Sequence, residues 1–122
     1  MKFHLQAPAA NVISALGKDW IRIGETEYRQ NLIVMPDAVV TGWAPAGFAA
    51  LTGANFAALL QYQPELVLLG TGAQQRFPHP RLLADLSRAR IGVEAMDTRA
   101  ACRTFNILVA EDRRVVAALL LD

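Results

Sequence analysis

The chain has 122 residues, of which 53% are hydrophobic and 19% charged, and its formal net charge is +1. This length is typical of a single domain, because two domains would each have too small a core to fold alone. The near balance of charge gives no electrostatic drive toward nucleic acid or an anionic membrane, and no apolar run is long enough to insert into a bilayer.

The first half of the chain, about residues 1–45, has the pattern of β-strands. Trp20–Ile23, Tyr28–Met35 and Ala38–Trp43 are rich in β-branched and aromatic residues and are separated by turn-forming glycine, proline and aspartate. The connections between them are too short for helical crossovers. We therefore expect antiparallel hairpins or a meander.

The second half, about residues 46–122, alternates between helix and strand patterns. Three segments have helical periodicity: one that is capped by Thr52 and ends before Pro64, one that starts at Pro80, and one that starts at Asp97–Thr98. Three apolar runs have strand character, at Glu65–Leu69, Ile91–Met96 and Val115–Leu121. We expect a common core that includes Leu66, Leu68, Phe105 and Leu119.

The order of these elements predicts the fold class. In the second half the order is strand, helix, strand, helix, strand. This order implies two right-handed crossovers and a parallel sheet. Joined to the β-rich half, this gives a single α/β domain over residues 1–122. We expect layered β/β/α architecture, with a mixed sheet that is parallel in its C-terminal β-α-β-α-β part and has antiparallel N-terminal strands.

Two segments leave the predicted parallel strands at their carboxyl ends, where open α/β sheets bind ligands. Gly70-Thr71-Gly72 follows one strand, and Asp97-Thr98-Arg99 follows another at the start of a helix. Glycine allows close backbone approach, and a helix start offers free N–H groups to an anion. If the two strands are neighbours in the sheet, the two segments would form a small pocket at one rim. A tight strand exit and an ordinary helix cap explain the same residues, and both interpretations stay open.

The helix that follows Asp97 supplies two further candidates for this pocket. Cys102, the only cysteine, lies near the helix start, where the macrodipole lowers a thiol pKa, and also on the apolar face, where cysteine packs as a small hydrophobe. We expect it to react slowly. Asn106 would hydrogen-bond across the rim or face water.

No motif for catalysis, a cofactor or a metal is present in the sequence. The third glycine of a dinucleotide fingerprint is missing, because Gln75 stands in its place. His4 and His79 are far apart and have no clustered ligands beside them. We therefore expect no cofactor, no metal and no catalytic set.

Four segments give the chain a resemblance to a known family. They are Glu65–Gly72, Arg76-Phe77-Pro78, Glu94–Thr98 and Ala101–Asn106, in that order. In this order they resemble a domain family of unknown function, whose relatives include a mitochondrial assembly factor for respiratory complex I and the adipogenesis-associated domain-containing protein of animals. The resemblance implies a compact layered β/β/α domain and supplies no agreed catalytic site. Asp112 stands where the family would have a glycine.

The mitochondrial relatives carry an N-terminal targeting extension, and residues 1–11 do not resemble one or a signal peptide. The chain therefore looks like a bacterial, cytoplasmic, stand-alone member of the family. The absence of a disulfide partner for its one cysteine fits a reducing compartment.

Two functions from different classes follow. The first is a non-catalytic binding or assembly module that acts on protein partners, including respiratory-complex assembly by resemblance, through an exposed apolar patch at Trp43, Pro45 and Phe48. The second is a binder of a small molecule or anion, or a minor enzyme, that uses the rim pocket. The sequence identifies neither the partner nor the oligomeric state.

Overall fold

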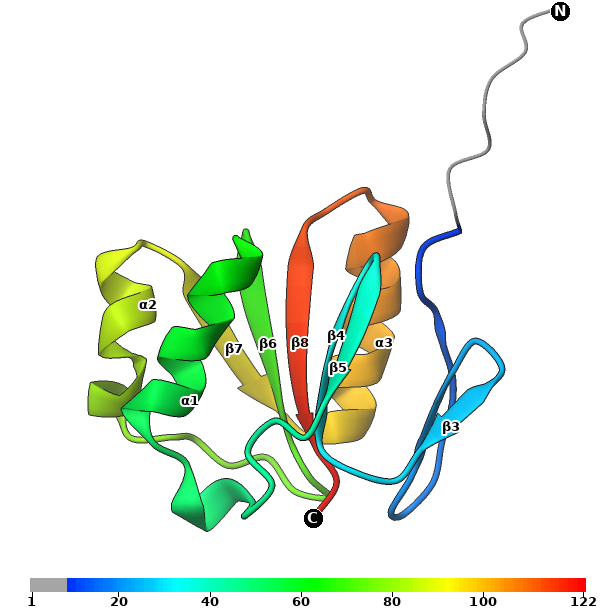
Figure 1. Ribbon diagram of the computed structural model, residues 1–122, viewed down its shortest axis with the longest axis horizontal. Helices are drawn as coiled ribbons and strands as arrows, with labels where there is room; N and C mark the ends of the chain where they lie inside the picture. Colours follow the sequence, from blue (N-terminus) through cyan, green and yellow to red (C-terminus); the bar gives the residue numbers. More distant parts are fainter. Residues whose placement is uncertain (1–8) are drawn as a thin grey trace, which may run out of the picture.

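The computed structural model describes residues 9–122, which form a central five-stranded sheet covered on both faces (Figure 1). One face carries α1 and α2, and the other carries α3 beside a three-stranded sheet. In chain order the elements are β1 (Ile13–Leu16), β2 (Ile21–Ile23), β3 (Thr26–Tyr28), β4 (Leu32–Met35), β5 (Ala38–Thr41), the 3₁₀ helix η1 (Phe48–Ala50), α1 (Gly53–Ala57), the 3₁₀ helix η2 (Ala58–Tyr62), β6 (Leu66–Thr71), the 3₁₀ helix η3 (Pro80–Leu83), α2 (Ala84–Arg88), β7 (Gly92–Met96), α3 (Thr98–Ala110) and β8 (Val115–Leu120).

The five-stranded sheet is mixed and has the strand order β5-β4-β8-β6-β7. β6 runs parallel to both of its neighbours, so that Leu66 lies opposite Gly92 on β7 and Val115 on β8. β4 runs antiparallel to β5 and to β8. These pairings confirm the predicted fold class, with a parallel C-terminal part and antiparallel N-terminal strands.

The two crossovers of the parallel part run in opposite directions along the sheet. The chain passes from β6 to its neighbour β7 through α2, and then returns beyond β6 to β8 through α3. Right-handed crossovers in opposite directions put their helices on opposite faces. Accordingly, Leu86 of α2 and Phe105 of α3 belong to two separate core clusters.

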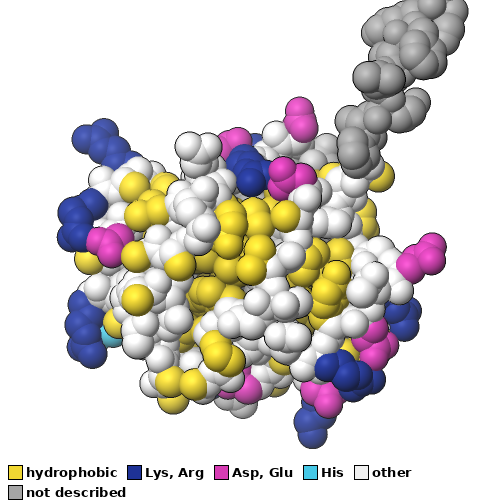
Figure 2. Space-filling view, viewed as in Figure 1, with side chains coloured by type: hydrophobic (Ala, Val, Ile, Leu, Met, Phe, Trp, Pro, Cys, Tyr) yellow, Lys and Arg dark blue, Asp and Glu magenta, His cyan; other side chains and the backbone are white. Residues whose placement is uncertain are grey.

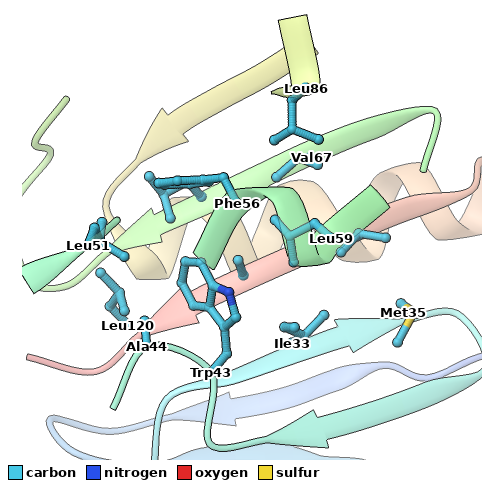
Figure 3. Close-up of a cluster of buried hydrophobic side chains, with 13 residues drawn as sticks. Ile33, Met35, Trp43, Ala44, Leu51, Phe56, Leu59, Val67, Leu86 and Leu120 are labelled. Carbon is cyan, nitrogen blue, oxygen red and sulfur yellow. The ribbon is translucent and has the colours of Figure 1, made fainter. Parts of the chain in front are cut away.

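The first cluster fills the space between the sheet and the α1 and α2 helices (Figure 3). Phe56 and Leu59, from α1 and η2, pack on Val67 of β6, and the ring of Trp43 meets that of Phe56 edge-on at 5.8 Å. Figure 3 shows Ile33 and Met35 of β4 on the same side of the sheet. Burial of this many large apolar side chains fixes the position of the two short helices.

The second cluster joins α3 and the three-stranded sheet to the other face. Leu68, Phe105 and Leu119 are fully buried in it, and Leu66 is partly buried against it. This confirms the core expected from the sequence. Ile21 of the three-stranded sheet is fully buried in the same cluster.

The segment Tyr28–Met35, expected as one strand, is two strands in two different sheets. Tyr28 ends β3, and Leu32 begins β4 opposite Leu119 of β8. Between them, the Asn31 side chain donates to the Ala44 carbonyl and accepts from the Leu121 N–H, each at 2.8 Å. The chain therefore turns at Asn31 because its apolar second part pairs with the distant strand β8.

All three predicted helices are present, although the first two are single α-helical turns extended by 3₁₀ turns. Thr52 caps α1 as expected: its hydroxyl accepts from the Asn55 N–H, and Asn55 Oδ1 accepts from the Thr52 N–H. Asp112 has φ +64°, a left-handed conformation that favours glycine and that aspartate tolerates. Within residues 9–122 the helices are too short or too polar to cross a membrane.

Candidate functional site

Thr98, the first residue of α3, joins the ends of two strands, β6 and β8, at the carboxyl edge of the parallel strands. Its N–H donates to the Gly72 carbonyl at 2.9 Å, and its hydroxyl oxygen accepts from the Gly72 N–H at 2.8 Å. The same hydroxyl donates to the Leu120 carbonyl at 2.6 Å. A Cβ on Gly70 would lie 2.9 Å from Thr98 Oγ1, so this close approach requires glycine. The structure thus brings the two predicted rim segments together.

Thr71 is fully buried beneath this rim and is held by Arg76. The Thr71 hydroxyl donates to the Gln74 carbonyl at 2.6 Å and accepts from the Arg76 N–H at 3.0 Å. Arg76 Nη2 in turn donates to the Thr71 carbonyl at 2.6 Å, while the guanidinium stacks over the Phe48 ring at 4.4 Å. Arg76 was not among the site residues expected from the sequence. Its only signal there is that Arg76-Phe77-Pro78 is one of the four segments that resemble the family.

A cavity of about 460 Å³ opens above Thr98. Four candidate residues line it: Gly72, Asp97, Thr98 and Arg99. The other wall is Leu16, Gly17 and Lys18, from the turn between β1 and β2. No local pattern marked this turn as part of the site, because it reaches the rim only through packing of the three-stranded sheet on α3.

The charges at the cavity are two exposed cations, Lys18 and Arg99, and the carboxylate of Asp97. Asp97 Oδ1 accepts from the Ala100 N–H at 2.9 Å and so caps α3. The helix start is therefore already occupied by an internal carboxylate. The cavity can offer an anionic group the two cations and the backbone beside Gly72.

Cys102 and Asn106 do not line this cavity. Both line a shallow groove of about 220 Å³ between α3 and β1. The pKa of the Cys102 thiol is raised to about 12, mainly because the thiol is buried; the charge of Arg99 lowers it and that of Asp97 raises it, both by less than the burial does. Asn106 exchanges two hydrogen bonds of 2.9 Å with the backbone N–H and carbonyl of Ile13. These bonds hold β1 on α3.

Trp43, Pro45 and Phe48 do not form the exposed apolar patch expected from the sequence. Trp43 is 6% exposed, packs in the first core cluster, and donates its indole N–H to the Asn55 carbonyl at 2.9 Å. Phe48 is half-buried under Arg76, and Pro45 is exposed. The correction follows from the packing of α1, which places Phe56 against the indole.

Titratable side chains are spread apart in residues 9–122, which contain no group of three His, Cys, Asp or Glu side chains that could hold a metal ion. His79 caps η3 through its Nδ1, which accepts from the Arg81 N–H at 3.1 Å. His4 lies outside the described residues. The expectation that the protein has no metal and no cofactor stays a prediction.

Comparison with known proteins finds one matching family model and several similar proteins. A family described as "Protein of unknown function (DUF498/DUF598)" matches residues 13–120. The "NADH dehydrogenase [ubiquinone] 1 alpha subcomplex assembly factor 3" of Mus musculus is 34% identical over 72% of this chain and 48% of its own length. The protein of the same name from Danio rerio is 45% identical over 51% of this chain and 36% of its own length.

The matched part is less than half of these curated relatives. A "13 kDa major membrane protein" of Francisella tularensis is 37% identical over 47% of this chain and 46% of its own length. The names of the curated relatives therefore describe proteins of which this chain covers only a part.

Solved structures match almost the whole chain. A Bordetella parapertussis protein is 38% identical, with a TM-score of 0.86, over 96% of this chain and all of that one. A Xanthomonas campestris protein is 34% identical, with a TM-score of 0.84, over 99% of this chain and 92% of that one. A structure described as an outer membrane protein from Bartonella henselae is 32% identical, with a TM-score of 0.81, over 93% of this chain and 96% of that one.

Proposed function

Because the chain belongs to the DUF498/DUF598 family of proteins of unknown function, we propose that it is a non-catalytic module that binds protein partners during assembly of a larger complex. Relatives named as assembly factors for NADH dehydrogenase support this class of function. The partner we propose is a subunit of a respiratory NADH dehydrogenase. The location we propose is the cytoplasm.

One observation carries the proposal: the polar side chains at the rim are already bonded to the protein's own backbone. Thr71 and Asp97 bond backbone groups three residues further along the chain, and Thr98 bonds the Leu120 carbonyl of β8. A nucleophile or general base has to be within reach of a substrate and to have a pKa suited to its task. Cys102 is buried, and its pKa is raised to about 12, which suppresses the nucleophilic thiolate.

The test of this function uses a host strain that lacks the gene. We expect loss of the mature NADH dehydrogenase on native gels and accumulation of a smaller subcomplex, both restored by the wild-type chain. The Cys102→Ala variant should restore assembly equally well, because the thiol has no chemical role. Normal assembly without the gene would overturn the respiratory partner, and failure of Cys102→Ala, if that variant is as stable as the wild type, would overturn the non-catalytic role.

The cavity at the rim supports a second candidate function, the binding of a small acidic molecule. Its volume of about 460 Å³ lies in the range of small-ligand sites, and the exposed cations Lys18 and Arg99 line it. Asp97 opposes an anion through its own charge. We therefore expect weak binding, which a chemical-shift titration with small anions would measure.

A further inference from the structure

A trough runs along the seam between β1 and α3. Its narrow part is the shallow groove of about 220 Å³, which is lined by Ser14, Arg99 and Arg103 among other residues. Leu16 and Arg99 line both this groove and the rim cavity of about 460 Å³, so the two hollows adjoin. Figure 1 shows α3 beside the three-stranded sheet, whose first strand is β1. We call the groove and the rim cavity together the β1–α3 trough.

Three cations line this trough, and no neighbouring acid pairs with them. Lys18 lies at the rim cavity, Arg103 at the narrow groove, and Arg99 at both. All three residues are exposed, and within residues 9–122 none of them forms a salt bridge. The described residues that line the narrow groove include no acid. The positive charge there is therefore available to an outside group.

The acidic residues near the trough are engaged elsewhere in the protein. Asp97 lines the rim cavity, where its carboxylate accepts from the Ala100 N–H and caps α3. Asp19, next to Lys18, does not line the trough and lies 3.4 Å from Arg29. Figure 2 shows acidic and basic side chains together where β3 lies, in agreement with the ion pairs of this sheet. Because Asp97 opposes an anion at the rim cavity, the narrow groove is the more strongly positive part of the trough.

The two arginines are spaced for an extended chain that has acids at alternate positions. Arg99 and Arg103 are four residues apart on α3, which is a rise of about 6 Å along the helix axis. In an extended segment every second side chain lies on the same side, about 7 Å from the next. Two acidic residues separated by one other residue would therefore each meet one guanidinium group, which pairs well with carboxylates.

Other occupants fit the trough less well. A small anion reaches only one or two of the cations that are spread along it. Within residues 9–122 no aromatic side chain lines the trough, whereas single-stranded nucleic acid takes much of its affinity from stacking on aromatic rings. A second copy that met this trough with its own would bring the same cations together. An acidic protein segment is complementary to all three cations.

We propose that the β1–α3 trough binds an extended segment of a protein partner that has acidic residues at alternate positions. Arg99 and Arg103 hold two of these residues, and Lys18 attracts the end of the segment that lies over the rim cavity. The proposal rests on the partner-binding function above and names the surface and the chemistry of the partner. The trough lies on the face of the sheet that α3 covers, opposite α1 and α2.

A direct test titrates a synthetic peptide of alternating glutamate and threonine into the isotope-labelled full chain at low salt. We expect clustered chemical-shift changes at residues 13–18 and 99–106, which weaken as salt is added. Free glutamate should bind about tenfold more weakly than the peptide, because it meets fewer cations, and the peptide with lysine in place of glutamate should not bind. Peptide shifts confined to residues 70–73 and 97–100, or equal binding of free glutamate, would overturn the proposal.

Matched arginine variants test whether the trough is the binding surface. The double variant Arg99→Gln/Arg103→Gln removes two charges at exposed positions, so the fold should be unaffected. We expect it to bind the peptide about tenfold more weakly. Arg81→Gln, at an exposed arginine of η3 that also forms no salt bridge within residues 9–122, should leave the affinity unchanged.

Two results of this comparison would contradict the trough as a site for a protein segment. One is an equal effect of the double variant and Arg81→Gln on the affinity for the peptide. The other is binding to phosphatidylglycerol vesicles that the double variant abolishes, together with no binding of the peptide. In that case the trough would take lipid headgroups and not a protein segment.

The assembly assay separates this proposal from the partner-binding function. We expect the double variant to fail to restore assembly and Arg81→Gln to restore it, with melting temperatures close to that of the wild type. If the double variant restores assembly, the trough is the wrong surface and the assembly function stands. If assembly never depends on the gene, the assembly function is wrong, and the peptide titration still decides whether the trough binds an acidic segment.

Discussion

Thr98 and Gly72 exchange two hydrogen bonds, one from each backbone N–H, at 2.9 and 2.8 Å. The Thr98 hydroxyl also donates to the Leu120 carbonyl. One buried side chain therefore holds the ends of β6 and β8 to the start of α3. The same bonds set the floor of the rim cavity, so that its shape depends on Thr98.

Replacement of this hydroxyl should be costly. Thr98→Val keeps the shape of the side chain but leaves the Gly72 N–H and the Leu120 carbonyl without their partner, in a site that is 4% exposed. We expect a loss of about 1–3 kcal/mol in the free energy of unfolding, measured by denaturant titration. Thr104→Val, on the same helix and half-buried, is the matched control. An equal loss in both variants would contradict the role given to Thr98.

Gly72 should tolerate no side chain. It has φ +93°, and a Cβ there would lie 1.6 Å from the Asp122 carbonyl oxygen. Gly24 has φ +59° and open space around it, so Gly24→Ala should show only the backbone cost of about 1–2 kcal/mol. Gly72→Ala should lower the free energy of unfolding clearly more than Gly24→Ala does in the same experiment. Similar losses for the two variants would mean that Asp122 moves aside freely.

Phe105 should be a main anchor of α3. It is fully buried against the sheet, and Phe105→Ala should cost about 3–5 kcal/mol. Ile107 is two residues away and 58% exposed. Ile107→Ala should therefore lower the free energy of unfolding by less than about 0.5 kcal/mol. A loss below about 1 kcal/mol for Phe105→Ala would be inconsistent with the packing of this helix.

The Cys102 thiol should react slowly near neutral pH. Burial raises its pKa from 9.0 to about 12, so the folded protein holds almost no thiolate there. Labelling of the native chain should be much slower than labelling of the unfolded chain. Equally fast labelling of both would show an exposed thiol.

The same shift predicts a pH dependence of stability. Above pH 9.0 the unfolded chain loses the thiol proton, while the folded chain keeps it up to about pH 12. The contribution of Cys102 to stability is therefore fully present below pH 9.0 and decreases as the pH rises toward 12. The difference in unfolding free energy between the wild type and Cys102→Ala should decrease over this interval. A difference in unfolding free energy that stays constant from pH 9 to 12 would contradict the raised pKa of Cys102.

The rim cavity should bind small anions weakly. Phosphate, sulfate and small carboxylates should shift the amide signals of residues 70–73 and 97–100 together, because Lys18 and Arg99 attract them while the Asp97 carboxylate keeps the helix start. Lys18→Gln should reduce these shifts, and Lys18 is exposed, so the fold should be unaffected. If no clustered shifts appear up to tens of millimolar anion, the cavity binds no anion and Asp97 serves only to cap α3.

The local pattern of the sequence determined most elements of the second half. The apolar run before Gly70, the proline at 80 and the cap at Asp97 each mark a strand or helix boundary, because they act through neighbouring backbone groups. The alternation of strands and helices then required parallel pairing of β6, β7 and β8. This order predicted that the rim segments would meet if their strands were neighbours, and the pairing of β6 with β7 meets that condition.

Only the tertiary structure decided the contacts between segments that are far apart in the chain. Leu32 does not continue the strand of Tyr28 but pairs with Leu119 in the other sheet. Asn106 forms a hydrogen bond with Ile13, 93 residues away. Neither contact has a local signal, because the partner is chosen by which apolar faces meet when the sheets and helices pack. Periodicity fixes what each segment can become, whereas burial against the rest of the chain fixes where its side chains point.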